Sequence, residues 1–146
     1  MTLCAKLLLK LGLTGIMISL DTNVVLRFLL DDVPEQTVKA KDIIEKNKVY
    51  VTDVVVAEIV YVLEKVILLS RQDIFELLTS FLGFANVVHN PYFLEDTIRF
   101  YEQHTSLSII DCYASAEAKA YKNQLVTFDK RLVSQGGKHV YGLYSK

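Results

Sequence analysis

The chain alternates between short apolar runs and longer segments in which apolar residues recur with helical spacing. The short runs are rich in β-branched residues, which is typical of buried strands, whereas spacings of three and four residues predict amphipathic helices. Strands are predicted at 16–20, 48–52, 85–90, 124–128 and 139–143. Helices are predicted at 24–29, 32–47, 53–69, 71–84, 94–104, 108–122 and 129–133.

This order predicts an α/β fold with a mostly parallel central sheet and helices on both of its faces, because parallel strands need helical crossovers. A length of 146 residues suits one domain. We place that domain at 17–146 and treat 1–16 as an N-terminal extension. Before the second helix, Asp32 and Glu35 have the spacing of a capping box, with Pro34 in the first turn, so Asp32 is predicted to cap that helix.

Composition indicates a partner but does not name one. Hydrophobic residues make up 51% of the chain, so apolar surface is expected to meet another protein or a second copy. The net charge of −1 gives no global attraction for nucleic acid. Two cysteines, Cys4 and Cys112, supply neither a zinc-site spacing nor a disulfide framework, which favours a reducing cytoplasm. Lys6 and Lys10 interrupt the apolar N-terminal run, so no signal peptide or membrane span is expected.

Two acidic residues directly follow predicted strands. Asp21 follows the first strand and Asp129 the fourth, at the carboxyl edge where ligands bind in open α/β sheets. An aspartate before a helix is also a common N-terminal cap, and this alternative stays open for both residues.

Two more acidic residues lie on predicted helices. The helical neighbours of Glu58 are largely apolar, so its carboxylate is expected to be buried or to lie on a cleft floor, with an ion pair to Arg27 as the alternative. Asp111 has small, uncharged neighbours that leave room for a ligand. Its position near a helix start leaves capping as the alternative.

Together, the four carboxylates favour a metal site. Four carboxylates in one crevice repel each other unless a hard divalent cation neutralises them, and Mg²⁺ or Mn²⁺ prefers oxygen ligands. Such a cation can activate a water molecule for attack on a phosphate, so the pattern suggests phosphodiester hydrolysis.

Four segments, "LDTNVVL", "VAEIVYVL", "SIIDCYASAEAKA" and "LVTFDKRL", resemble in order and spacing the motifs of the PIN domain, particularly of VapC-type toxins. The resemblance covers residues 17 to about 143. It implies a metal-dependent ribonuclease whose acidic quartet is Asp21, Glu58, Asp111 and Asp129.

The same resemblance implies supporting residues and partners. Asn23 would orient the first acid, Thr22 completes the opening triplet, and Thr127 would support the fourth acid. Ser108 stands where many relatives carry an acid. The implied partners are an RNA substrate, a second copy in a homodimer, and an antitoxin that lies beside the quartet, where a basic side chain would mimic the cation.

Without the quartet, 17 − 4 = 13 acidic residues remain against 16 basic ones, a net charge of +3. Basic residues that flank the quartet in sequence are therefore candidate phosphate contacts, with an ordinary solvated charge as the alternative for each. These candidates are Arg27, Lys119, Lys122, Lys130 and Arg131.

Rival functions remain open at this point. A phosphatase of the haloacid dehalogenase type would need a second aspartate where this chain has Asn23, so that reading fails. A catalytically silent binding module with the same fold and a stand-alone nuclease without an antitoxin both stay as alternatives. The sequence does not identify the RNA, the cut site or the number of metal ions.

Overall fold

The computed structural model describes residues 6, 10 and 15–144. Most of the predicted N-terminal extension, including Cys4, therefore lies outside the described residues. The chain forms two compact units. The first comprises the described residues up to Ile59 together with Ser80–His89, and the second comprises Val60–Thr79 with the described residues from Asn90 onward.

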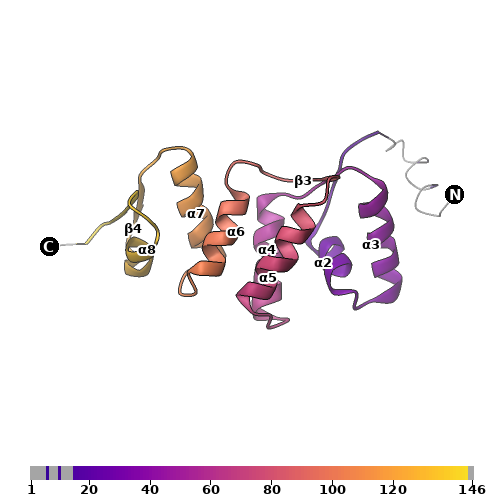
Figure 1. Cartoon of the computed structure of the whole chain (residues 1–146), viewed down its shortest axis with the longest axis horizontal. Helices are drawn as coiled ribbons and strands as arrows, with labels where there is room; N and C mark the ends of the chain where they lie inside the picture. Colours follow the sequence, from indigo (N-terminus) through magenta and orange to yellow (C-terminus); the bar gives the residue numbers. More distant parts are fainter. Residues whose placement is uncertain (1–5, 7–9, 11–14, 145–146) are drawn as a thin grey trace. The chain divides into compact units, whose positions relative to one another are not determined.

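The first unit contains a three-stranded parallel sheet in the order β1-β2-β3. Its strands are β1 (Ile18–Ser19), β2 (Val49–Tyr50) and β3 (Val87–Val88), and its complete helices are α2 (Thr22–Leu30) and α3 (Pro34–Lys46), which pack together (Figure 1). Aromatic packing adds to this core, because Phe28 contacts both Phe81 and Phe84. The strands are shorter than predicted, but each lies inside its predicted range.

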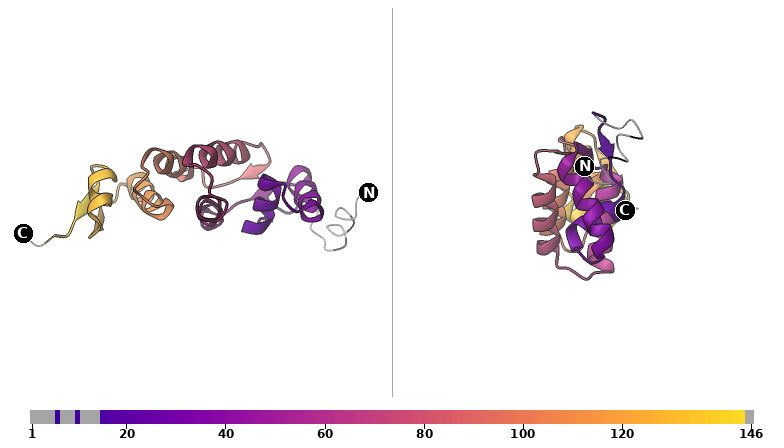
Figure 2. Two further views of the ribbon diagram at one scale, coloured as in Figure 1. Left: turned by 90° about the horizontal axis from the view of Figure 1, so that it is seen from below. Right: turned by 90° about the vertical axis from the view of Figure 1, so that its right-hand side faces the viewer.

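The second unit pairs β4 (Leu125–Thr127) with β5 (Val140–Gly142) in parallel. The short helix α8 (Lys130–Gln135) connects these strands and packs on them (Figure 2). Helices α6 (Leu94–Gln103) and α7 (Ile109–Ala120) pack against each other through buried residues such as Ile98, Tyr101 and Cys112. Every strand pairing described is parallel, as predicted for an α/β fold.

Two helices are divided between the units, namely α4 (Asp53–Lys65) and α5 (Arg71–Leu82). Helix α4 is shorter than the predicted 53–69. Beyond Lys65 the amide of Ile67 donates to the carbonyl of Val62, five residues earlier, and Leu68 adopts a left-handed conformation (φ 64°), so the regular four-residue hydrogen-bond spacing of the helix stops there. No helix in the described part of the chain is long and apolar enough to cross a membrane.

The predicted cap at Asp32 is wrong. Helix α3 begins with Pro34 after Val33 at the cap position, and no side chain there caps the helix. Asp32 instead accepts hydrogen bonds from Nη1 of Arg27 at 2.6 and 2.7 Å. This ion pair holds the pKa of Asp32 below its usual value. A cationic partner within reach thus competes with the backbone amides for the carboxylate.

Candidate functional site

Asp21 lies where the sequence predicted, directly after the first strand and at the N-terminal cap position of α2. Its backbone carbonyl accepts from the amides of Val24 and Val25, but its side chain makes no cap hydrogen bond. The capping alternative is therefore wrong for this side chain. The carboxylate of Asp21 is exposed, and neither of its oxygens is used to cap α2.

Glu58 lies on α4 in the same unit, and its position corrects two expectations. Its side chain is exposed rather than buried, because the buried stripe of α4 runs through Val56, Ile59 and Leu63. Arg27 does not pair with it, since that guanidinium binds Asp32.

The partner of Glu58 is instead Thr22, whose hydroxyl donates to Oε2 of Glu58 at 2.5 Å. Thr22 is buried and follows Asp21 in the chain. This bond therefore brings the glutamate to the end of α2 that carries Asp21, which unites the first two predicted acids.

Asp111 lies in the first turn of α7 in the second unit, where it closes a capping box with Ser108. Oδ2 of Asp111 accepts from the amide of Ser108 at 3.0 Å and from its hydroxyl at 2.7 Å, while the amide of Asp111 donates to Oγ of Ser108 at 3.1 Å. The capping alternative is thus confirmed for Asp111. The box engages Oδ2 of Asp111 and so restrains the orientation of the carboxylate.

Asp129 is the N-terminal cap of α8, so capping is confirmed here too. Its Oδ1 accepts from the amides of Arg131 at 2.8 Å and Leu132 at 3.4 Å. The hydrogen bond from the Arg131 amide is the main reason that the pKa of Asp129 lies below its usual value. The carboxylate is therefore ionised at neutral pH. Thr127 lies beside it, and its Oγ1 accepts from the amide of Asp129 at 3.0 Å.

The predicted basic contacts are partly engaged within the protein. Arg27 is paired with Asp32, which is not a quartet acid, and Arg131 lies near a quartet acid, with its Nε at 3.7 Å from Oδ1 of Asp129. Lys130 faces the ring of Tyr144 at 5.8 Å. Lys119 is exposed on α7, and Asn23 is exposed on α2.

The four acids thus fall into two pairs, with Asp21 and Glu58 in the first unit and Asp111 and Asp129 in the second. Among the residues that the structure describes, no group of three or more His, Cys, Asp or Glu side chains is close enough to hold a metal ion. The donor chemistry nevertheless fits a hard cation, because these acids present carboxylate oxygens that are not all used in caps.

Cys112 is not a candidate catalytic nucleophile. Cys112 lies on α7 with its side chain buried, and burial raises the pKa of its thiol to about 12. A thiol that stays protonated at neutral pH is not a nucleophile. Sequence reasoning missed a different set of residues, Arg99 on α6 and Lys138 and His139 in the turn between α8 and β5, which carry no motif.

Comparison with known proteins places the chain in a family. The model of the PIN domain matches residues 18–138. A VapC ribonuclease from Aquifex aeolicus (strain VF5) is 30% identical over 128 residues, which cover 83% of this chain and 93% of that protein. No solved structure matches the chain. The family match spans both units and all four acidic motifs, so this chain belongs to the PIN domain family, as a protein of the VapC type.

Proposed function

We propose that this protein is a ribonuclease that depends on Mg²⁺ or Mn²⁺ and acts as the toxin of a toxin–antitoxin pair. The observation that carries the proposal is the likeness over most of the chain to a VapC ribonuclease, in a sequence that keeps four acidic motifs. Asp21, Glu58, Asp111 and Asp129 are the proposed metal ligands and catalytic residues.

When bound, the divalent cation would neutralise the carboxylates, polarise the scissile phosphate and supply an activated water. The chain's own residues prepare those ligands. Thr22 fixes Glu58 through its hydroxyl, and the amides of Arg131 and Leu132 keep Asp129 ionised. Ser108 orients Asp111 through two hydrogen bonds, which limits the rotamers that this carboxylate samples.

The direct test compares purified Asp21→Asn and Asp111→Asn with wild type for RNA cleavage in Mg²⁺ and in Mn²⁺. Each change replaces a carboxylate oxygen with an amide nitrogen, so cleavage should fall below detection while the fold is kept. Asp31→Asn is the matched control, since Asp31 is exposed and asparagine tolerates its left-handed backbone (φ 53°). Undiminished cleavage by Asp111→Asn would contradict the assignment.

The same variants test whether the cation binds these acids. Metal that relieves carboxylate repulsion should raise the melting temperature of wild type more than that of Asp111→Asn. Equal shifts would mean that the cation binds elsewhere. An inert wild type that still bound a partner protein would favour the silent binding module.

Apolar residues exposed along α4 support the proposed homodimer. Val54 and Tyr61 on α4 and Val66 just after it are 77%, 60% and 64% exposed, which is apolar surface that a partner could cover. Light scattering at micromolar concentration should give the mass of a dimer, and a monodisperse monomer would refute this part of the proposal.

An antitoxin that covers the acidic residues is proposed as the second protein partner. Co-expression with the product of an adjacent small gene should relieve growth arrest, and the two chains should purify together. Toxicity that persists in a stable complex would show that the partner leaves the site open. Absence of such a gene would favour a stand-alone nuclease.

A further inference from the structure

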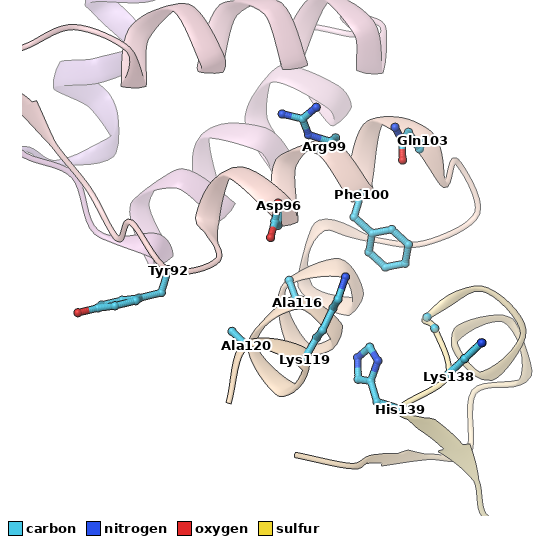
Figure 3. A pocket seen from close by; sticks show the side chains of 12 residues that line it. Tyr92, Asp96, Arg99, Phe100, Gln103, Ala116, Lys119, Ala120, Lys138 and His139 are labelled. Carbon is cyan, nitrogen blue, oxygen red and sulfur yellow. The ribbon is translucent and has the colours of Figure 1, made fainter. Parts of the chain in front are cut away.

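A cavity of about 650 Å³ lies in the second unit, and its lining includes neither Asp111 nor Asp129 (Figure 3). Helix α6, helix α7 and the turn between α8 and β5 line it. This volume lies within the ~300–1,000 Å³ range typical of ligand pockets. The cavity is therefore large enough for a group the size of a nucleotide.

The lining carries an excess of positive charge. Arg99, Lys119 and Lys138 contribute one cation from each of the three segments, and Asp96 is the one carboxylate among the lining residues. All three cations are exposed, and none has a carboxylate within ion-pair distance among the described residues. This distinguishes them from Arg27 and Arg131, which are paired with aspartates.

The turn that carries Lys138 has a fixed backbone. Gly137 has a φ of 107°, and a Cβ added to Gly136 would lie 2.5 Å from the carbonyl oxygen of Leu132. The hydroxyl of Ser115 donates to the carbonyl of Gly136 at 2.5 Å, and Nε2 of His139 lies 2.8 Å from the carbonyl oxygen of Ser115. Helix α7 therefore holds this turn from both sides of Lys138.

Aromatic side chains accompany the cations. In Figure 3, Lys119 and the ring of His139 extend toward Phe100, while Tyr92 lies at the edge of the cavity with its ring directed away from the other labelled side chains. Tyr92 is 77% exposed, so its ring has a free face. Cations that track a backbone and aromatic rings on which bases stack are the combination by which proteins bind single-stranded nucleic acid.

We infer that this cavity binds a single-stranded segment of RNA that flanks the cut site, with Arg99, Lys119 and Lys138 on its phosphates and Tyr92 beneath a base. The inference rests on the proposed function and deepens it. Lys119 lies eight residues after Asp111 on α7, which corresponds to about 12 Å along the helix axis. An RNA strand cut near Asp111 would therefore reach the cavity a few nucleotides away.

The test measures binding without cleavage. A fluorescent single-stranded RNA of about 16 nucleotides, a length that such grooves accommodate, is titrated in EDTA with purified wild type and with the triple variant R99Q/K119Q/K138Q. The variant should bind about tenfold more weakly or worse. The slope of log affinity against log salt should become shallower by about 2, since each lost phosphate contact on a single strand contributes about 0.7.

The matched control is K46Q/K48Q/K65Q, which removes the same charge from exposed lysines outside the cavity. It should keep the wild-type salt slope. Tyr92→Ala should weaken binding while Tyr92→Phe should not, because phenylalanine retains the ring on which a base stacks. Equal affinity loss in the two triple variants would overturn the inference, since it would show a general charge effect.

Cleavage assays separate the two proposals. If wild type cleaves RNA in Mg²⁺ or Mn²⁺ and the cavity variant binds the probe as wild type does, the cavity inference fails and the proposed function stands. If wild type neither binds nor cleaves RNA, both fail. If the cavity variant instead loses a co-expressed antitoxin and binds RNA normally, the cavity belongs to the protein partner and the inference is overturned.

Discussion

The hydroxyl of Thr22 donates a hydrogen bond to the carboxylate of Glu58, and it thereby joins the first turn of α2 to α4. Thr22 is buried whereas Glu58 is exposed, so the bond anchors an exposed acidic side chain to the packed interior. An acid that is held in one rotamer is a better ligand than one that samples many, because less entropy is lost on binding.

Thr22→Val should therefore lower RNA cleavage more than it lowers stability. Valine keeps the shape, and Glu58 regains hydration, so the free energy of unfolding should fall by about 1 kcal/mol or less. Thr22→Ser should restore cleavage, because serine keeps the donor. Cleavage rates are measured across a metal titration, and the free energy of unfolding of both variants is measured by urea denaturation. Full activity in Thr22→Val would show that Thr22 does not position Glu58 for cleavage.

Asp129 combines a helix cap with a proposed ligand, and two substitutions separate these roles. Asp129→Asn keeps a cap acceptor, so it should stay close to wild type in melting temperature but lose cleavage. Asp129→Ala should lose both. If Asp129→Asn stays active and only the unstable Asp129→Ala loses cleavage, the role of Asp129 is purely structural.

The pKa of Asp129 also predicts a pH effect on stability. Because its pKa is lower in the folded state, it adds stability above its ordinary value near 3.8, and this contribution disappears as pH falls through the lower folded-state pKa. The difference in melting temperature between wild type and Asp129→Ala should therefore be largest near neutral pH and shrink toward pH 3. A difference that grew on acidification would contradict this sign.

Ser108 is predicted to matter for folding more than for chemistry. Ser108→Ala removes the hydroxyl from the capping box of α7 and should lower the free energy of unfolding by about 1 kcal/mol. The amide of residue 108 still donates to Oδ2 of Asp111 and keeps this carboxylate oriented, so cleavage should persist under conditions in which the variant is folded. Urea denaturation measures the loss of stability, and cleavage is measured at urea concentrations below the unfolding transition. Complete loss of cleavage by the folded variant would contradict this prediction.

Arg71 is predicted to be the largest single polar contributor to the second unit. Its guanidinium donates to the carbonyls of Tyr101, His104 and Leu107 at 2.8–3.0 Å and lies 3.2 Å from the carboxylate of Glu64. Its carbon Cζ also lies 3.9 Å from the centroid of the Tyr101 ring.

Arg71→Ala leaves three carbonyls without this donor, so unfolding should become easier by roughly 3 kcal/mol or more. Arg71→Lys should recover only part, because an ammonium group lacks the planar fork of donors. The measurement is the urea midpoint at constant m-value. A loss below about 1 kcal/mol would show that water replaces these bonds.

Leu68 offers a stabilising change. It is 78% exposed and has a φ of 64°, where a side chain with a Cβ costs about 1–2 kcal/mol. Leu68→Gly should relieve this strain and raise stability by about 1 kcal/mol, even though glycine makes the unfolded chain more flexible. Thermal melts test the sign, and Leu68→Ala, which keeps the Cβ, is the control that should not stabilise.

Hydrophobic periodicity was sufficient to place the helices, because each one buries a stripe that the sequence displays directly. It misplaced the end of α4, since apolar residues continue to Leu69 and the left-handed residue is a leucine rather than the glycine that signals such an end. It also expected Glu58 to be buried, because α4 carries apolar side chains on several faces and the sequence does not say which face packs.

Local chemistry in the candidate site was predictable to different degrees. The caps at Asp111 and Asp129 follow from nearby sequence and were among the stated alternatives. The Thr22–Glu58 bond and the Arg27–Asp32 pair depend on tertiary distances and on competition for one carboxylate, which spacing alone does not determine. The catalytic roles of the acids stay a prediction.

The adjacent glycines at 136 and 137 restrict which changes of the backbone related proteins can accept in the turn that carries Lys138 and His139. Any side chain at Gly136 would force α8 away from β5, because the carbonyl of Leu132 and the side chain of Val140 already occupy that space. The path of the backbone beneath Lys138 and His139 is thus tied to the packing of the whole C-terminal segment. Related proteins that bind different ligands at this turn are expected to differ in its exposed side chains. Insertions that change the backbone of the turn should be rare.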